Sequence, residues 1–303
     1  KMGVLTQTYL CCGRGIADLM AYRTDKLFRD FPELGGIYYD ICDVKTCGNT
    51  AHGCGGTDAF GKPYLSSSAM QLRHYLMRIY KIAHKHGKQV FNHAHNYFNP
   101  VAHNFSDIWY PGENEVWLYC EAPLDEYQCA WNPQIRGTAV LRCTQVTRVL
   151  TFMKKLAPRR KELSSPEISE RSLVSALLHD FSTDSDWINH GVIQKWWGIK
   201  EKLNFDKAKF HGYWFDNAAR SASEKVYVSW YELEAPSEYS RLLVIGNLGR
   251  SPQKAALVLN LKELGLEEKT PEMKELWSNR KISAGELNSH IIPGNHFLLI
   301  GIR

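Results

Sequence analysis

A change in the period of hydrophobic residues near residue 222 constrains the fold more than any other feature of this sequence. Upstream, apolar residues recur at helical spacings in the ranges 16–31, 72–83 and 188–203, and short β-branched or aromatic runs separate these ranges. Downstream, apolar residues alternate with polar ones, as in the range 226–230. The sequence therefore predicts an α/β region followed by an antiparallel β region.

Alternating helices and strand-like runs are typical of parallel βα units, which close into a barrel when eight strands are present. We predict a catalytic TIM-type (β/α) barrel over residues 1–221 and a C-terminal antiparallel β-sandwich over residues 222–303 that supplies no catalytic groups. Fewer than eight barrel strands can be recognised, so either several strands are too irregular to be seen from the pattern, or the barrel is incomplete, with N-terminal strands missing. The chain would then be the C-terminal part of a longer polypeptide, and the N-terminal part of that polypeptide is an expected partner.

Composition excludes two classes of partner. The formal net charge is +5, and the basic residues are scattered among acids, which argues against nucleic acid as a partner. No apolar run reaches the roughly 18 residues of a membrane span. Aromatic residues make up 12% of the chain, and such rings provide flat platforms for sugars, with Trp109, Trp117 and Trp131 as candidates.

Two acidic side chains are the predicted catalytic pair. Asp40 closes the strand-like run 37–41, and Glu113 follows a Tyr-Pro-Gly turn that could swing its carboxylate over a barrel mouth. Glycoside cleavage usually requires one protonated acid and one ionised carboxylate, which this pair would supply. Asp180 ends another strand-like run, 173–180, and Asp107 is next in line. The alternatives are that Asp40 only caps the following loop and that Glu113 is an exposed acid of a turn.

His93 and His95 form a second group of candidate site residues. They lie two positions apart on a predicted strand, so their side chains project from the same face. With a carboxylate they could bind a metal, they could donate hydrogen bonds to sugar hydroxyls, or one of them could be a core histidine.

A loop rich in cysteine and glycine follows the first of these strands. Cys42, Cys47, His52 and Cys54 offer enough soft ligands for a tetrahedral zinc ion. A disulfide between Cys47 and Cys54, or free thiols, remain equally open, and no other cofactor is expected. We also expect Cys47 and Cys54 to lie close together, with Asn49 and His52 turned toward a pocket above Asp40.

A set of short motifs along the chain carries a resemblance to a known family, and the loop Asn-x-x-His-Gly-Cys-Gly is its most specific part. The motifs comprise Tyr39, Asp40, Cys47, Asn49, 52–55, Gly61, Lys62, Arg73, Tyr80, His86, Gly87, 111–113, 177–180 and 208–214. Over most of its length the chain resembles the barrel of bacterial proteins similar to glycoside hydrolase family 123. The resemblance implies a secreted or periplasmic carbohydrate-degrading protein with a barrel flanked by β-sandwiches.

The sequence departs from this family at the catalytic motif. The family acts on β-linked N-acetylgalactosamine through an adjacent Asp-Glu pair. Here the Asp125-Glu126 pair is predicted to begin a helix, where acids are favoured by the helix dipole. The family mechanism therefore does not carry over to this chain.

The function predicted from the sequence is hydrolysis of a glycan or oligosaccharide by the pair Asp40 and Glu113. A metal-dependent hydrolase that uses His93 and His95 with a carboxylate is the alternative, and a non-catalytic carbohydrate-binding barrel is a third reading. The predicted substrate-binding residues are Asn49, His52, His93, His95, Trp109 and Asp180.

Overall fold

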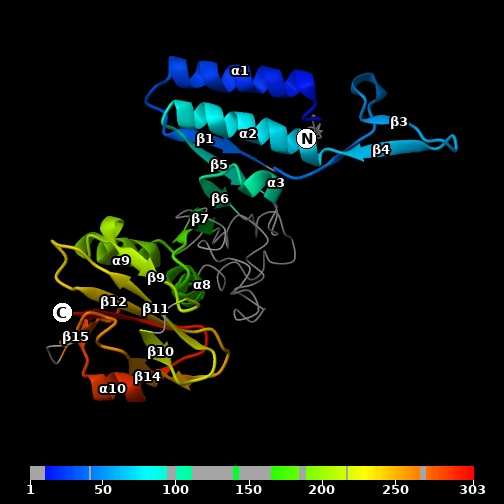
Figure 1. Ribbon diagram of the computed structural model, residues 1–303. Helices are drawn as coiled ribbons and strands as arrows, with labels where there is room; N and C mark the ends of the chain where they lie inside the picture. The colour runs from blue at the N-terminus through cyan, green and yellow to red at the C-terminus, as the bar shows by residue number, and fades with distance from the viewer. Residues whose placement is uncertain are drawn as a thin grey trace, which may run out of the picture. The chain divides into compact units, whose positions relative to one another are not determined.

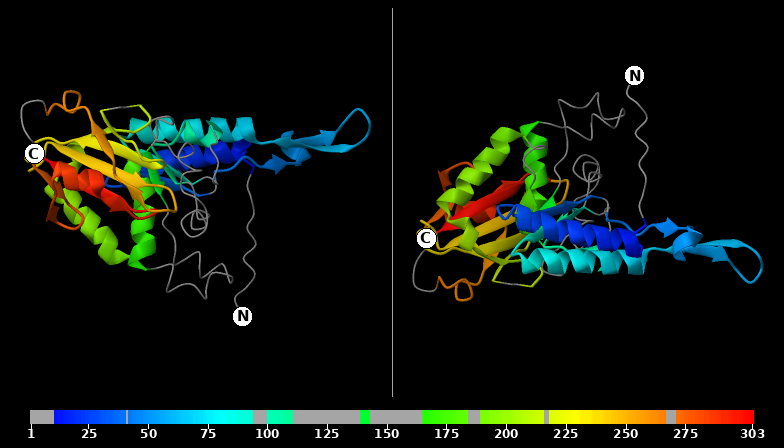
Figure 2. Two further views of the ribbon diagram at one scale, coloured as in Figure 1. Left: turned by 90° about the horizontal axis from the view of Figure 1, so that it is seen from below. Right: turned by 90° about the horizontal axis from the view of Figure 1, so that it is seen from above.

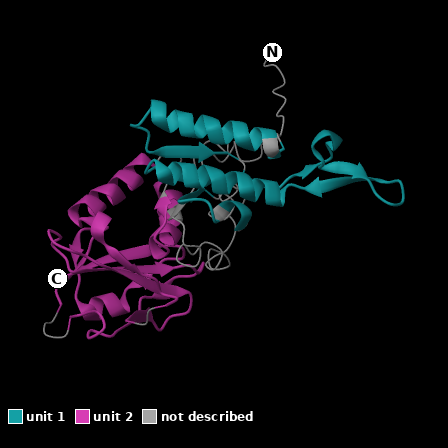
Figure 3. Cartoon of the chain, turned by 45° about the horizontal axis from the view of Figure 1, so that its top comes forward, with its two compact units in different colours: residues 1–112, 136–139 teal, residues 113–135, 140–303 magenta. Residues whose placement is uncertain are grey.

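The computed structural model describes most of the chain, in eight stretches (Figure 1). Its contacts divide the chain into two compact units, unit 1 with residues 1–112 and 136–139 and unit 2 with residues 113–135 and 140–303 (Figure 3). No helix in the described stretches is long and apolar enough to cross a membrane. The described residues are 11–40, 42–93, 100–110, 139–142, 165–183, 189–215, 218–266 and 271–303.

Unit 1 packs helices against a small parallel sheet. The strands of this sheet follow the order β1-β5-β6, and the helices α1 and α2 lie side by side in all views (Figures 1 and 2). The apolar stripe predicted from helical spacing, including Leu72, Leu76 and Ile79, is the buried face of α2. Gly87, with a φ of 68°, takes the left-handed conformation that ends this helix. The elements are α1 (Arg14–Asp30), β1 (Gly36–Tyr39), β2 (Thr46–Cys47), η1 (Thr50–His52), β3 (Gly55–Thr57), β4 (Pro63–Ser67), α2 (Ala69–Lys85), β5 (Gln89–His93), α3 (Pro100–His103) and β6 (Ile108–Tyr110).

A short antiparallel arm projects from this unit, beyond the N-terminal end of α2 (Figure 1). The arm comprises residues 46–67, in which β2 and β3 both pair with β4. Two glycines let its strands approach closely, because a Cβ at Gly55 would collide with the carbonyl oxygen of Gly48. The arm has little core of its own, since Phe60 is 86% exposed and Leu65 is 65% exposed.

Unit 2 is built on a six-stranded antiparallel sheet of order β16-β15-β18-β12-β11-β9. Leu242 and Val244 of β12 face a core shared with α8 and α9, whereas Leu243 and Ile245 face a second core that includes Leu287 of α10. Both faces of the sheet are therefore buried, which fits the continuous apolar run 242–245, whereas the alternation in the range 226–230 by itself predicts only one buried face. The elements are β7 (Ala139–Arg142), α8 (Pro166–Leu178), β8 (Ser182–Thr183), α9 (His190–Lys202), η5 (Phe205–Lys207), β9 (Lys209–His211), β10 (Ala219–Ser221), β11 (Val226–Glu232), β12 (Arg241–Asn247), β13 (Gln253–Lys254), β14 (Leu257–Leu259), β15 (Met273–Glu275), β16 (Arg280–Lys281), α10 (Ala284–Ser289), β17 (Ile291–Ile292) and β18 (Phe297–Ile302).

The strand predicted to end at Asp180 is wrong, because residues 173–178 belong to the helix α8. Ser165 caps this helix by accepting a hydrogen bond from the backbone N–H of Ile168, and Pro166 occupies its first turn. A short, largely apolar run fits a buried helix as well as a buried strand, and the capping residues upstream decide between them.

The compact units also do not follow the predicted boundary between residues 221 and 222. β9 pairs with β11, and Phe205 and Phe210 pack against Tyr231 of that strand. These segments therefore share one core with the C-terminal sheet. In the described stretches the parallel strands form small sheets without a closed barrel, so the barrel remains a prediction.

Candidate functional site

Asp40 and His93 meet at the carboxyl ends of two adjacent parallel strands. β1 and β5 are in register with Tyr39 opposite Asn92, so the next residue on each strand, Asp40 and His93, lies at the same edge of the sheet. His93 Nδ1 is 2.5 Å from Asp40 Oδ1, and the Tyr38 hydroxyl donates a hydrogen bond to the same oxygen at 3.0 Å. The Asp40 side chain is 60% exposed, so a carboxylate positioned by two partners faces solvent.

Aromatic rings surround this pair. The ring of His93 contacts Tyr110 edge to face with centroids 4.9 Å apart, and Tyr38 contacts Phe91 at 5.0 Å. Tyr110 is buried, whereas Tyr38 is 47% exposed. The carboxylate therefore lies beside an accessible aromatic surface, which can contact the apolar face of a ligand.

Three residues predicted for the site, one tryptophan and two aspartates, have structural roles. Trp109 is fully buried, so its ring cannot serve as a sugar platform. Asp107 accepts a hydrogen bond from the backbone N–H of Val90 at 2.7 Å and contacts His84 at 2.9 Å, which ties β6 to its neighbours. Asp180 belongs to unit 2, where it accepts a hydrogen bond from the Tyr231 hydroxyl and burial raises its pKa.

Several predicted residues lie outside the described residues. They include Glu113, the expected catalytic partner of Asp40, and His95, the expected partner of His93. The aromatic candidates Trp117 and Trp131 also lie there. The pairings that involve these residues remain predictions.

A cluster of sulfur and nitrogen donors lies at the base of the arm. Its members, which we call the thiol cluster, are Cys11, Cys47, His52 and Cys54, and their potential ligand atoms all lie within 4.8 Å of one another. The Sγ atoms of Cys11 and Cys54 are 3.7 Å apart, and Cys47 Sγ is 3.7 Å from His52 Nε2. The expected proximity of Cys47 and Cys54 is confirmed.

Cys42 was predicted for this cluster, and Cys11 takes its place. Cys42 is buried in the core of unit 1, where its thiol contacts the carbonyl oxygen of Tyr39 and burial raises its pKa strongly. Cys11 was missed because it precedes α1 and is 36 or more residues away from the others in the sequence. His52 contacts Cys47 rather than Asp40, and Asn49 caps η1 through its side chain.

The thiols of the cluster differ in acidity. A hydrogen bond from the backbone N–H of Asn49 lowers the pKa of Cys47, and the thiols of Cys11 and Cys54 add to this effect. Loss of solvent raises the pKa of Cys54 to about 11, with Cys11 and Cys47 contributing to the increase. The Cys47 thiol therefore ionises more readily than the Cys54 thiol.

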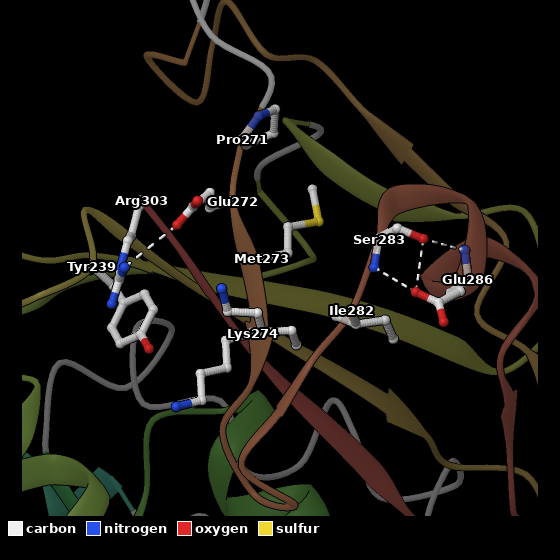
Figure 4. Close-up of a pocket in the computed structure, with 10 residues that line it drawn as sticks. Tyr239, Pro271, Glu272, Met273, Lys274, Ile282, Ser283, Glu286 and Arg303 are labelled. Carbon is white, nitrogen blue, oxygen red and sulfur yellow. Dashed lines mark hydrogen bonds and ion pairs between the residues drawn. The ribbon is translucent and has the colours of Figure 1, made fainter.

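A hollow of about 320 Å³ lies in unit 2, in the region expected to lack a site (Figure 4). Its two acids already have partners: Glu272 accepts from Arg303 at 3.4 Å, and Glu286 accepts from the Ser283 backbone at 2.8 Å, a capping bond that lowers its pKa. Because the lining carboxylates serve these structural contacts, the hollow is a weaker catalytic candidate than the Asp40 pair.

Comparison with known proteins does not assign the chain. No protein-family model and no curated protein matches it. Among solved structures, it is similar to the crystal structure of Ttha1563 from Thermus thermophilus, with 11% sequence identity, a TM-score of 0.30, and coverage of 95% of this chain and 90% of that chain. A likeness at this TM-score carries no argument about fold or function.

Proposed function

We propose that the chain is a glycoside hydrolase that cleaves a glycan or oligosaccharide with Asp40 as one of two carboxylates. The observation that supports the proposal is the exposed Asp40 carboxylate at the carboxyl ends of parallel strands, with Tyr38 and His93 on one of its oxygens. Two partners of this kind fix the orientation of a carboxylate, which suits a nucleophile or general base.

The second carboxylate in the proposal is Glu113, as general acid. A retaining mechanism needs the two carboxyl groups about 5 Å apart, and an inverting mechanism needs room for a water molecule between them. The accessible ring of Tyr38 beside the carboxylate would contact the apolar face of the sugar.

The test is turnover of a panel of aryl glycosides and natural glycans by Asp40→Asn and Glu113→Gln. Each variant should lose about 10²- to 10⁴-fold in kcat with an unchanged melting temperature. Glu33→Gln is the matched control, because Glu33 is an exposed acid in the turn before β1, at the opposite end of that strand. An Asp40→Asn variant that retains normal turnover would show that Asp40 is not catalytic.

A second candidate function is a metal-dependent hydrolase built on His93, and one observation favours it. A carboxylate on one ring nitrogen is the usual way in which proteins orient a metal-binding histidine, and Asp40 contacts His93 at Nδ1. Under this proposal, with His95 as a further ligand, His93→Ala should lose one equivalent of bound metal. A variant with unchanged metal content would exclude it.

A further inference from the structure

The thiol cluster joins two segments that are distant in sequence. Cys11 lies in the segment before α1, and the other three members lie in or beside the loop of the arm, so Cys11 and Cys54 are separated by 43 positions. A Cβ at Gly13 would lie 3.7 Å from His52 Nδ1, which shows that the histidine packs directly on the segment before α1. We propose that Cys11, Cys47, His52 and Cys54 bind one structural zinc ion that fastens the arm to this segment.

The distances within the cluster agree with tetrahedral coordination. With Zn–S bonds of about 2.3 Å, two sulfurs of a tetrahedral site lie about 3.8 Å apart, and a sulfur and a nitrogen lie slightly closer. The observed 3.7 Å from Cys11 Sγ to Cys54 Sγ and 3.7 Å from Cys47 Sγ to His52 Nε2 match these separations. A disulfide would instead require about 2.05 Å between sulfurs.

The backbone conformation of the loop brings these side chains together. The carbonyl oxygen of Asn49 accepts hydrogen bonds from the N–H groups of Cys54 and Gly55, at 3.1 and 3.3 Å. Gly53 adopts a φ of 77°, which glycine permits at little cost and which reverses the chain between His52 and Cys54. The loop therefore reverses direction, and the potential metal-ligating atoms of Cys47, His52 and Cys54 lie close together.

Hydrogen-bond donors also reach the sulfurs from outside the cluster. The backbone N–H of Asn49 donates to Cys47, and Gln71 Nε2 on α2 lies 4.0 Å from Cys54 Sγ. Donors of this kind stabilise thiolates and hold metal ligands in orientation. On zinc binding, each of the three cysteines would release its proton to solvent and bind as thiolate.

The arm also needs a cross-link. Its strands are two to five residues long, and its large apolar side chains Phe60, Tyr64 and Leu65 are 86%, 45% and 65% exposed. Small sheets without a buried face are marginally stable in water. Since all four ligands come from the protein, the coordination sphere is closed, as in structural rather than catalytic zinc sites.

The test is the metal content of the full chain, purified after expression with zinc in the medium. About one zinc per chain is expected, and Cys11→Ser and Cys47→Ser should each reduce it at least tenfold. Cys12→Ser and Cys42→Ser are the matched controls, because neither thiol belongs to the cluster, and both should retain the ion. Loss of zinc from Cys42→Ser but not from Cys11→Ser would overturn the proposed ligand set.

A second measurement does not depend on how the variants fold. Cobalt(II) added to the metal-free parent chain should produce thiolate-to-cobalt charge transfer and the intense visible bands of tetrahedral cobalt, and zinc should displace both. In the zinc form, Cys11, Cys47 and Cys54 should be protected from alkylation until a chelator is added. A parent chain that takes up neither ion, or in which Cys11 and Cys54 form a disulfide, would overturn the proposal.

Discussion

The central sheet of unit 2 and the arm of unit 1 are both antiparallel, yet they bury very different amounts of apolar surface. In β12 of unit 2, Leu242 and Leu243 are both fully buried although their side chains point to opposite faces. In the arm, Leu65 is 65% exposed and Phe60 is 86% exposed. The same local structure therefore needs another source of stability in the arm, and the thiol cluster is the feature placed to supply it.

The same contrast between exposed and buried side chains applies to the reactive groups of unit 1. The Asp40 side chain is 60% exposed and His52 of the thiol cluster is exposed, whereas the apolar side chains of β12 in unit 2 are buried. A densely packed core holds its side chains in place but leaves no room for a ligand. Chemistry is therefore expected in unit 1 and stability in unit 2.

The largest predicted effect is the response of the arm to zinc removal. With zinc bound, we expect slow amide exchange in β3 and β4, and a chelator should abolish that protection because the cross-link is lost. Exchange in β12 and β18 should not change, since their stability comes from apolar burial. Hydrogen exchange followed by mass spectrometry measures both regions in one sample. Equal loss of protection in the two regions would remove the distinction between them.

The next largest effect is expected on the free energy of unfolding when one leucine in each region is truncated. Leu243→Ala should lower the free energy of unfolding by about 2 to 5 kcal/mol, because it leaves a cavity in a closed core. Leu65→Ala should change it by about 0.5 kcal/mol or less, because the side chain is already exposed to water. Urea titration measures both values. A large loss of unfolding free energy in Leu65→Ala would contradict this prediction, because it would mean that the Leu65 side chain is packed against other apolar groups.

Two asparagines provide a similar comparison for hydrogen bonds. Asn247 is fully buried; its Nδ2 donates to the carbonyl of Ser251 at 2.9 Å, and its Oδ1 accepts from the N–H of Gly249 at 3.0 Å. Asn247→Ala should cost about 1 to 3 kcal/mol, since it leaves these groups unpaired. Asn49 is exposed, and its side-chain oxygen accepts one hydrogen bond, from the N–H of Ala51. Asn49→Ala should therefore lower the free energy of unfolding by about 1 kcal/mol or less. Thermal unfolding of both variants tests this order.

The sequence was sufficient to predict secondary structure where a periodic pattern is long. Helical spacing predicted α1, α2 and α9, and strict alternation predicted β11, because each pattern repeats over several turns or residues. The pattern in residues 173–178 is largely apolar and too short to distinguish a helix from a strand. The capping signal of Ser165 and Pro166 was present upstream and would have identified α8.

The candidate site was less accessible to sequence reasoning. Spacing along the chain grouped Cys42 with the loop cysteines, but Cys42 faces the core, and Cys11 reaches the loop through the tertiary fold. Trp109 carries the ring expected of a sugar platform, and yet residue type does not say which face of a strand is covered. Asp40 and His93 could be placed at one sheet edge, because adjacent parallel strands end together.

The smallest predicted effect concerns Asp180. Burial raises its pKa in the folded chain above the unfolded value, so folding favours the neutral carboxyl group. The stability that this group contributes is therefore fully present below the unfolded pKa of about 3.9 and is lost as the pH rises through the folded pKa. At neutral pH the ionised side chain therefore lowers the stability of unit 2, and the effect is small because residue 180 is exposed and water screens its charge.

Residue 180 is exposed and water screens its charge, so Asp180→Asn should raise the melting temperature at pH 7 by about 1 °C or less, and the gain should shrink as the pH falls toward about 4. The amide resembles the neutral carboxyl group, its oxygen can accept the Tyr231 hydrogen bond, and asparagine tolerates the φ of 57° found at this position. Glu234→Gln is the control, because this exposed acid should show no such pH-dependent difference. Thermal unfolding at several pH values makes the comparison. A lower melting temperature for Asp180→Asn at pH 7 would contradict this prediction, because it would mean that the negative charge of Asp180 stabilises the fold.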